Sequence, residues 1–248
     1  MTPLATVHHG DNREWLATLP PDSHDVCVSD PPYADETHNG ARSGAHGSFD
    51  ATGQPTALLA TQFTSIAFPD LRDTLGLVGT VTRRWIVITC DWRHGSKLSE
   101  TPPAGVRFVR FGVWVKPNGA PQFTGDRPGQ GWEAVAWLHR EGVPLKWNGG
   151  GRSSVFTEPK VSGEHPTTKP LPLLRQFVAL TSDGGPVLDP WCGSGGVGVA
   201  AVERGLAFSG CDIDAKWVAL ARARIDAAAG QGTLFATLAR AKQQEIDL

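Results

Sequence analysis

The sequence predicts an α/β fold with a doubly wound, mostly parallel sheet. Short apolar runs of the kind found in buried strands alternate along the chain with segments of helical pattern. Two of these runs lead directly into unusual segments, a Pro-rich tetrapeptide in one case and a Gly-rich turn in the other. Because ligands of such sheets bind at the carboxyl ends of the strands, both segments are candidates for a functional site.

The individual elements are placed by apolar pattern and turn residues. Strands are predicted at Ala5–His9, Asp25–Ser29, Trp85–Thr89, Pro186–Asp189 and Ala207–Cys211, with an antiparallel pair at Val106–Val115 and Glu133–Leu138. Helices are predicted at Arg13–Leu19, over residues 56–82 with Pro69 as an interruption, from Pro170 to Thr181, at Val199–Arg204, from Asp214 to Asp226, and over residues 234–248.

Length and composition set broad limits. A chain of 248 residues suits one domain with its own core. It has no signal-peptide pattern and no apolar run of membrane-spanning length, so we expect a soluble, cytoplasmic protein with no membrane partner. The four cysteines lack zinc-site spacing, and we expect buried thiols and no metal site: Cys27, Cys90, Cys192 and Cys211.

Charge is distributed unevenly along the chain. Residues 83–169 carry a net charge of +6, and the rest of the chain carries −8. A moderately basic middle region favours a polyanionic partner, although surface charges also segregate by chance.

Residues 193–198 form a G-x-G-x-x-G turn that follows a strand, opens a helix and precedes Asp212 at the end of the next strand. Such a turn lets an adenosine-containing ligand approach the backbone, and the acid accepts hydrogen bonds from ribose hydroxyls. NAD is one ligand of this kind. Asp189, just before the glycines, would repel a pyrophosphate and suits a ligand with positive charge, which favours S-adenosylmethionine.

Three segments together resemble motifs of the β-group DNA amino-methyltransferases, in a short, phage-like form. Asp30-Pro31-Pro32-Tyr33 looks like their catalytic (D/N/S)PP(Y/F/W) motif. Residues 189–195 (DPWCGSG) look like their cofactor motif, and residues 165–170 (HPTTKP) like the segment that precedes it. The motif order is that of the β group, although Gly196-Val197 replaces a frequent Thr-Thr pair. The resemblance covers about the first 33 and the last 85 residues.

The resemblance implies a Rossmann-like, S-adenosylmethionine-dependent methyltransferase domain over residues 1–248, with an inserted target-recognition region. It divides the chain into a catalytic-motif half (1–33), a mobile active-site loop (34–55), a DNA-recognition region (90–164) and a cofactor-binding half (165–230).

The chemistry of the tetrapeptide agrees with methylation of an exocyclic amino group. The nitrogen is a poor nucleophile because its lone pair is delocalised into the base. Acceptors on its N–H groups, the Asp30 carboxylate and the Pro31 carbonyl, would localise and aim that pair. Pro31 and Pro32 stiffen the backbone, and Tyr33 offers a ring to stack on a base taken out of the duplex.

Further site residues follow from the motifs and the resemblance. The expected cofactor contacts are Asp11, His165, Thr168, Lys169, Asp189, Pro190, Trp191, Gly193, Ser194, Gly195, Asp212 and Ile213. A turn-forming role explains Asp11 nearly as well, and incidental loop charge explains His165 and Lys169 equally well. Glu133 is taken as a structural acid.

Basic residues in polar or Gly-rich loops are the expected DNA contacts: His38, Arg42, Lys116, Arg127 and Arg152. Solvated loop charge accounts for each of them about as well. Trp147, in a Gly-rich loop, is either a wedge between bases or, more commonly for such a residue, a hydrophobic anchor.

The sequence therefore predicts a DNA adenine-N6 methyltransferase acting on double-stranded DNA. The resemblance implies adenine, because Ser is the more usual first motif residue in the cytosine-N4 enzymes of the family, and cytosine-N4 methylation is the alternative. RNA or protein-glutamine methylation, a non-catalytic DNA-binding protein and a nucleotide-dependent oxidoreductase are less well supported. The sequence leaves open whether the chain forms a homodimer and whether a restriction nuclease accompanies it.

Overall fold

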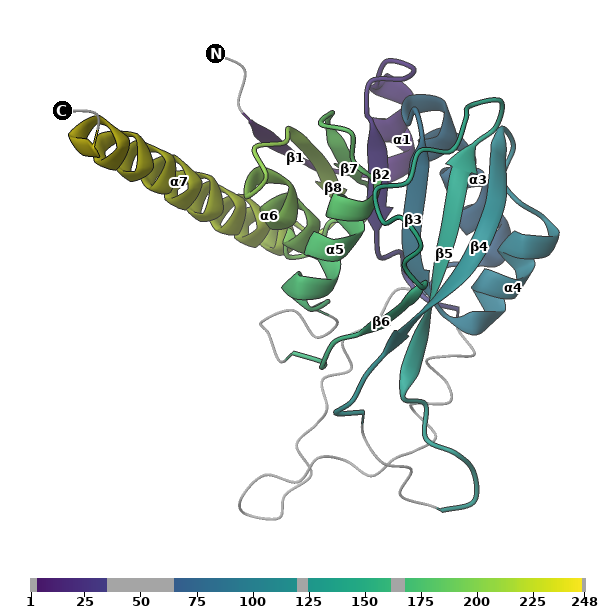
Figure 1. Ribbon diagram of the computed structural model, residues 1–248. Coiled ribbons are helices and arrows are strands. Elements are labelled where there is room, and N and C mark those ends of the chain that lie inside the picture. Colours follow the sequence, from purple (N-terminus) through teal and green to yellow (C-terminus); the bar gives the residue numbers. More distant parts are fainter. Residues whose placement is uncertain (1–3, 35–64, 120–124, 162–167, 247–248) are drawn as a thin grey trace.

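The computed structural model describes residues 4–34, 65–119, 125–161 and 168–246, which form one eight-stranded sheet with helices on both faces (Figure 1). The strands are β1 (Ala5–His9), β2 (Val26–Ser29), β3 (Trp85–Cys90), β4 (Val106–Val115), β5 (Trp132–Arg140), β6 (Val155–Thr157), β7 (Val187–Asp189) and β8 (Phe208–Asp212). The helices are α1 (Asn12–Thr18), α3 (Phe68–Val81), α4 (Trp92–Glu100), α5 (Leu171–Thr181), α6 (Gly196–Val202) and α7 (Ala215–Ile246).

The strand order is β1-β8-β7-β2-β3-β5-β4-β6. Neighbours from β1 to β3 pair in parallel, β5 pairs antiparallel with β3 and β4, and β6 runs parallel to β4. The predicted α/β fold with a mostly parallel sheet is confirmed, as is the antiparallel pair.

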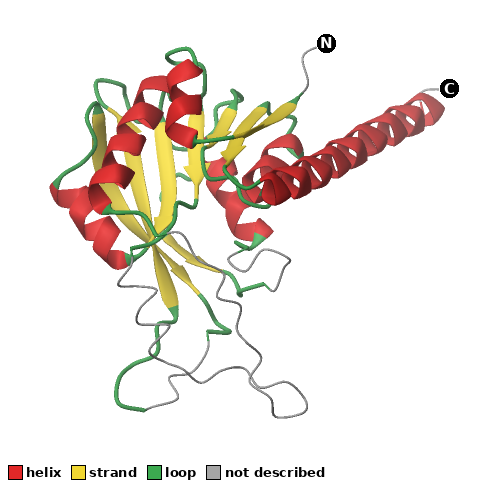
Figure 2. Cartoon of the chain, turned by 180° about the vertical axis from the view of Figure 1, so that it is seen from behind, coloured by secondary structure: helices red, strands yellow, loops and turns green. Residues whose placement is uncertain are grey.

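Alternating side chains of the central strands build two separate cores. Val26 and Val28 of β2 pack on one face, where α5, α6 and α7 cover the sheet, and Cys27 packs on the other. Helices α1, α3 and α4 cover that second face (Figure 2). All four cysteines are buried free thiols, as predicted. The strands are apolar on both sides because both faces are covered.

Acidic residues gather along one edge of the sheet as a result of this topology. Each strand from β1 to β3 in the sheet order ends in or is followed by an aspartate: Asp11 after β1, Asp212 in β8, Asp189 in β7, Asp30 after β2 and Asp91 after β3. Strand β5 runs in the opposite direction, and Ala134 pairs with Cys90, so β5 begins at the edge where β3 ends. This brings Glu133 to the same edge.

Four details of the prediction are wrong. Helix α4 and strand β6 were not expected. Pro69 does not interrupt a helix but lies in the first turn of α3, where its missing N–H costs nothing. The two helices expected near the C-terminus are one continuous helix, α7. The predicted loop at residues 34–55 lies outside the described residues except for Ala34.

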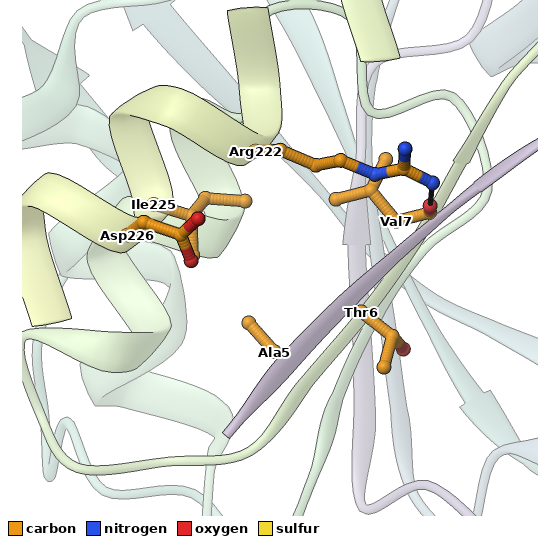
Figure 3. A pocket seen from close by; sticks show the side chains of 6 residues that line it. All are labelled: Ala5, Thr6, Val7, Arg222, Ile225 and Asp226. Carbon is orange, nitrogen blue, oxygen red and sulfur yellow. Dashed lines mark hydrogen bonds between the residues drawn. The ribbon is translucent and has the colours of Figure 1, made fainter. Parts of the chain in front are cut away.

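Helix α7 is tied to the edge strand β1 by a side chain. Arg222 donates to the Val7 carbonyl at 2.6 Å beside a hollow of about 290 Å³ (Figure 3). The other residues that line this hollow are Ala5, Thr6, Ile225 and Asp226, none of them a predicted site residue. Within the described part of the chain, no helix has the length and apolar character needed to cross a membrane.

Candidate active site

The catalytic motif and the Gly-rich turn meet where the neighbouring strands β2 and β7 end. Ser29, the last residue of β2, donates its hydroxyl to Asp189 Oδ1 at 2.5 Å, and both side chains are buried. Asp30 is the next residue after Ser29. A side-chain hydrogen bond therefore links Ser29 and Asp189, which are 160 positions apart in the sequence.

Asp189 is a buried carboxyl that has no cationic partner among the described residues. Its Oδ1 also accepts from the Trp191 amide at 3.2 Å, but no lysine or arginine among the described residues pairs with it. Burial, with smaller contributions from Asp30 and Asp212, raises the pKa of Asp189 to about 7 against the effect of its hydrogen bonds. Such a carboxyl suits a ligand that carries an ammonium group.

The Gly-rich turn is held by backbone geometry and by Asp212. The Gly193 amide donates to Asp212 Oδ2 at 2.8 Å, and the Asp214 amide donates to Oδ1 at 2.9 Å. Gly195 has φ of +77°, and a Cβ there would lie 2.9 Å from the Ala221 backbone, so only glycine fits. Ser194 Oγ accepts from Arg224 of α7 at 2.7 Å, so the Ser194 side chain contacts α7.

Asp30 is half-buried, and each of its carboxylate oxygens accepts one hydrogen bond from a side chain. Thr89 Oγ1 of β3 donates to Oδ1 at 2.5 Å, and Lys169 Nζ donates to Oδ2 at 2.5 Å. Burial raises the pKa of Asp30, and the charge of Lys169 opposes this effect. Lys169 thus pairs with the first residue of the catalytic motif, a contact that the sequence analysis did not foresee.

Tyr33 is held by a second acid in the same cluster. Its hydroxyl donates to Glu133 Oε2 at 2.5 Å, and Lys169 Nζ lies 3.5 Å from the same oxygen. Lys116 donates to Glu133 Oε1. Burial tends to raise the pKa of Glu133, but the two lysines outweigh it and the net effect is a lowered pKa. The cluster thus contains two carboxylates, two ammonium groups and one phenol.

The backbone around the motif is fixed from the neighbouring strand. Asp91 Oδ2 accepts from the Ala34 amide at 3.0 Å, while its Oδ1 caps α4 by accepting from Arg93 and His94. The Ile66 amide donates to the Tyr33 carbonyl at 3.2 Å. Within the described part of the chain, no donor hydrogen-bonds the Pro31 carbonyl, which is left as an acceptor.

The other predicted cofactor residues differ in their hydrogen bonds and in how far they are exposed. Asp11 caps α1 through the Arg13 and Glu14 amides, the turn-type role considered for it above. Pro190 is buried and accepts from Asn12 through its carbonyl at 3.2 Å, Trp191 and Thr168 are half-buried, and Ile213 is 72% exposed. His165 lies outside the described residues.

The predicted DNA contacts differ in exposure. Lys116 is not an exposed loop cation: its side chain is 11% exposed because it pairs with Glu133. Arg127 is exposed beside Asp126, and Arg152 is exposed while bonding to Gln176. His38 and Arg42 lie outside the described residues. Trp147 packs edge-on against Trp85 and Trp137, which makes it a hydrophobic anchor.

Four residues that hold the motif or the cofactor carboxyl were missed as site residues: Ser29, Thr89, Asp91 and Glu133. Glu133 is an acid at the start of the apolar run of β5, which was an available signal. Its meaning depends on the antiparallel register that places the start of β5 beside the end of β3. Asp91 follows a buried strand as Asp30 does, and that pattern was also readable from the sequence.

Comparison with known proteins identifies the family. The model of the N6/N4 DNA methylase family matches residues 85–223, more than half of the chain. The chain belongs to the DNA methylase family. It is therefore a DNA amino-methyltransferase, and enzymes of this family depend on S-adenosylmethionine.

Relatives of known name agree with this assignment. The chain is 26% identical to the type II methyltransferase M2.DpnII of Streptococcus pneumoniae, with 88% of each chain covered. It is also 26% identical to the type II methyltransferase M2.LlaDCHI of Lactococcus lactis subsp. cremoris, with 92% of this chain and 91% of the relative covered.

Solved structures share the fold of this DNA methylase. The complex of M1.HpyAVI with S-adenosylmethionine has a TM-score of 0.65 at 20% identity, covering 89% of this chain and 99% of that one. The cytosine-N4-specific PvuII DNA methyltransferase has a TM-score of 0.67 at 14% identity, covering 90% and 87%. The predicted Rossmann-like methyltransferase fold is confirmed.

Proposed function

We propose that this DNA methylase transfers the methyl group of S-adenosylmethionine to the N6 amino group of an adenine taken out of double-stranded DNA. The observation that carries the proposal is the direct link between the two halves of the site. Ser29 bonds to Asp189 at 2.5 Å and is followed at once by Asp30, so a cofactor carboxyl and a catalytic carboxyl lie at adjacent strand ends.

The residues at the end of β7 and β8 fit the methyl donor. We assign Asp189 to its α-ammonium group, because this buried carboxyl lacks a cation among the described residues. Asp212 is assigned to the ribose hydroxyls, since a carboxylate has about four acceptor positions and only two are used here. The proposed set around them is Asp11, His165, Thr168, Pro190, Trp191, Gly193, Ser194, Gly195 and Ile213. When bound, S-adenosylmethionine supplies an electrophilic methyl group.

The tetrapeptide prepares the amino nitrogen. Asp30 and the Pro31 carbonyl accept its two N–H groups, which localises the lone pair and points it in one direction. The positive charge that develops on the nitrogen is stabilised by the Asp30 carboxylate, which also receives the proton released after transfer. Pro32 fixes the backbone that presents the carbonyl, and Tyr33, held through its hydroxyl by Glu133, offers a ring to the base.

The basic middle region is proposed to contact the DNA. Residues 83–169 carry a net charge of +6, which favours a phosphate backbone. Arg127 and Arg152 are exposed and suit phosphate contacts, whereas Lys116 is reassigned to the buried cluster. A restriction-modification context is proposed from the type II relatives.

The test is incubation with labelled S-adenosylmethionine and duplex DNA that contains every short sequence, followed by nucleoside mass analysis. We expect N6-methyladenine as the product. N4-methylcytosine as the sole product would overturn the base assignment while leaving the amino-group chemistry intact. A complete lack of methylated nucleoside would overturn the proposal.

A further inference from the structure

Two exposed tryptophans lie next in the chain to residues that hold the catalytic segment. Trp92 begins α4 and is 48% exposed, and Trp132 begins β5 and is 38% exposed. Asp91 precedes Trp92 and accepts from the Ala34 amide. Glu133 follows Trp132 and accepts from the hydroxyl of the last motif residue. Both tryptophans therefore lie at the edge of the sheet that carries the catalytic motif.

The two tryptophans line one hollow of about 380 Å³. The other residues that line it are Pro128, Gly129 and Gln130, from the loop that leads into β5. This volume falls within the range of pockets that bind small molecules, about 300–1,000 Å³. None of these five described residues is charged. The hollow therefore suits a flat, uncharged, aromatic group better than it suits a phosphate.

Two arginines adjoin the residues of this hollow. The Arg93 guanidinium lies 4.6 Å from the centroid of the Trp92 ring. Arg127 directly precedes Pro128 and is exposed beside Asp126. Aromatic rings next to arginines are the combination with which proteins bind unpaired nucleotides, because the rings stack on bases and the cations attract the backbone.

A base of the substrate DNA fits this hollow better than a protein partner does. The enzyme acts on DNA, so DNA is brought to this edge of the sheet. A specific protein–protein interface takes about 20–30 residues on each side, whereas five residues line the hollow. Aromatic stacking accepts any base, because every base has a π face.

The hollow is separate from the proposed position of the target base, since neither Asp30 nor Tyr33 lines it. Drawing the target base out of the duplex rotates its nucleotide about the backbone. The next nucleotide of the same strand is tied to this displaced backbone, whereas the opposite strand keeps its own stack. A base that flanks the target in the same strand is therefore the one that reaches the hollow.

We propose that Trp92 and Trp132 form a second base site, which stacks a base that flanks the target in the same DNA strand. The inference rests on the proposed function, because it requires a target base that has left the duplex. Stacking in the hollow offsets part of the stacking energy that the DNA loses when it opens. The site stabilises the opened DNA and takes no part in the transfer of the methyl group.

The experiment measures DNA binding by fluorescence anisotropy, with a duplex that the wild-type enzyme methylates and with S-adenosylhomocysteine in place of the methyl donor. The intact duplex is compared with duplexes that lack the base on one side of the target, the base on the other side, or the base opposite the target. Trp92→Ala and Trp132→Ala each remove one ring, and Trp92→Phe and Trp132→Phe keep one. Leu145→Ala is the control, because it removes an exposed apolar side chain beyond the other end of β5.

We expect Trp92→Ala and Trp132→Ala to bind the intact duplex at least about fivefold more weakly than the wild type, the lower end of what stacking one base contributes. On the duplex that lacks one of the two flanking bases, this difference should vanish, because the stacking partner is missing for every variant. The phenylalanine variants and Leu145→Ala should bind the intact duplex as tightly as the wild type.

Three results would overturn the inference while leaving the proposed function intact. The first is equal binding of the intact duplex by the wild type and both alanine variants. The second is a loss that persists on every duplex, which indicates a structural role or a phosphate contact. The third is a loss that vanishes only when the base opposite the target is missing, which assigns the hollow to the other strand. A wild-type protein that methylates no duplex would instead overturn the proposed function, and the inference with it.

Discussion

Asp189 is a carboxyl whose charge changes near neutral pH. Burial raises its pKa to about 7. As pH falls through 7, Asp189 takes up a proton and loses its attraction for an ammonium group. The ligand's own α-amino group only gains positive charge over that range. We expect the dissociation constant of S-adenosylmethionine, measured by calorimetry, to rise about tenfold between pH 7.5 and pH 5.5.

Asp189→Asn is the matched control for this pH dependence. The amide has nearly the same shape but cannot ionise, so cofactor binding should be weak and insensitive to pH. A dissociation constant for the wild type that stays constant from pH 7.5 to pH 5.5 would contradict the assignment of Asp189 to the ammonium group.

The sequence was sufficient to predict the roles of residues that belong to a motif or stand beside a recognisable turn. Asp30 and Tyr33 belong to a motif, and Asp189 precedes a Gly-rich turn at a strand end. Glu133 and the true partner of Lys169 could not be found in this way. Their roles arise from contacts across 100 or more positions, between Tyr33 and Glu133 and between Asp30 and Lys169.

Asp91, which connects β3 to α4, allows a test of whether a neighbouring strand positions the catalytic motif. Asp91 uses one oxygen to cap α4 and the other to hold the Ala34 amide next to the catalytic motif. An asparagine at position 91 has only one side-chain oxygen. We expect that oxygen to keep accepting from the two amides at the N-terminus of α4, so that the contact with the Ala34 amide is lost. We expect Asp91→Asn to keep its melting temperature within a few degrees of the wild type and to lose about tenfold in kcat.

Asp91→Ala supplies the comparison, because it removes the cap as well as the loop contact and should lower both the melting temperature and kcat. If Asp91→Asn has the kcat of the wild type, the contact between Asp91 and Ala34 does not position the motif. The Km for S-adenosylmethionine should change little in Asp91→Asn, since Asp91 is not an assigned cofactor contact.

Buried strands were predictable as elements, whereas short polar elements were not. Strands β2 and β3 are mostly apolar and buried at every position because both of their faces are covered. Helix α4 buries His94, Gly95 and Leu98, of which only Leu98 is a large apolar residue, so its sequence gives little apolar pattern to recognise. Strand β6 has three residues, too few for a pattern. Its pairing with β4 is set by tertiary structure.

The molecule as a whole collects its chemistry at one edge of the sheet. Asp30, Glu133, Lys169 and Asp189 come from four different parts of the chain and meet where β2, β7 and β3 end and β5 begins. The sequence was sufficient to predict a site at strand ends, because parallel α/β sheets place ligands there. It was not sufficient to predict the charge-balanced cluster, which requires the antiparallel strand β5.

The central claim is that Asp30 orients the amino group while a separate carboxyl, Asp189, holds the cofactor. The most direct measurement pairs the methylation rate of Asp30→Ala on duplex DNA with its affinity for S-adenosylmethionine by calorimetry. We predict a loss of at least about a hundredfold in rate, the scale found when one stabilising group is removed from a transition state, with cofactor affinity within a few-fold of the wild type. Methylation by Asp30→Ala at the wild-type rate would contradict the account.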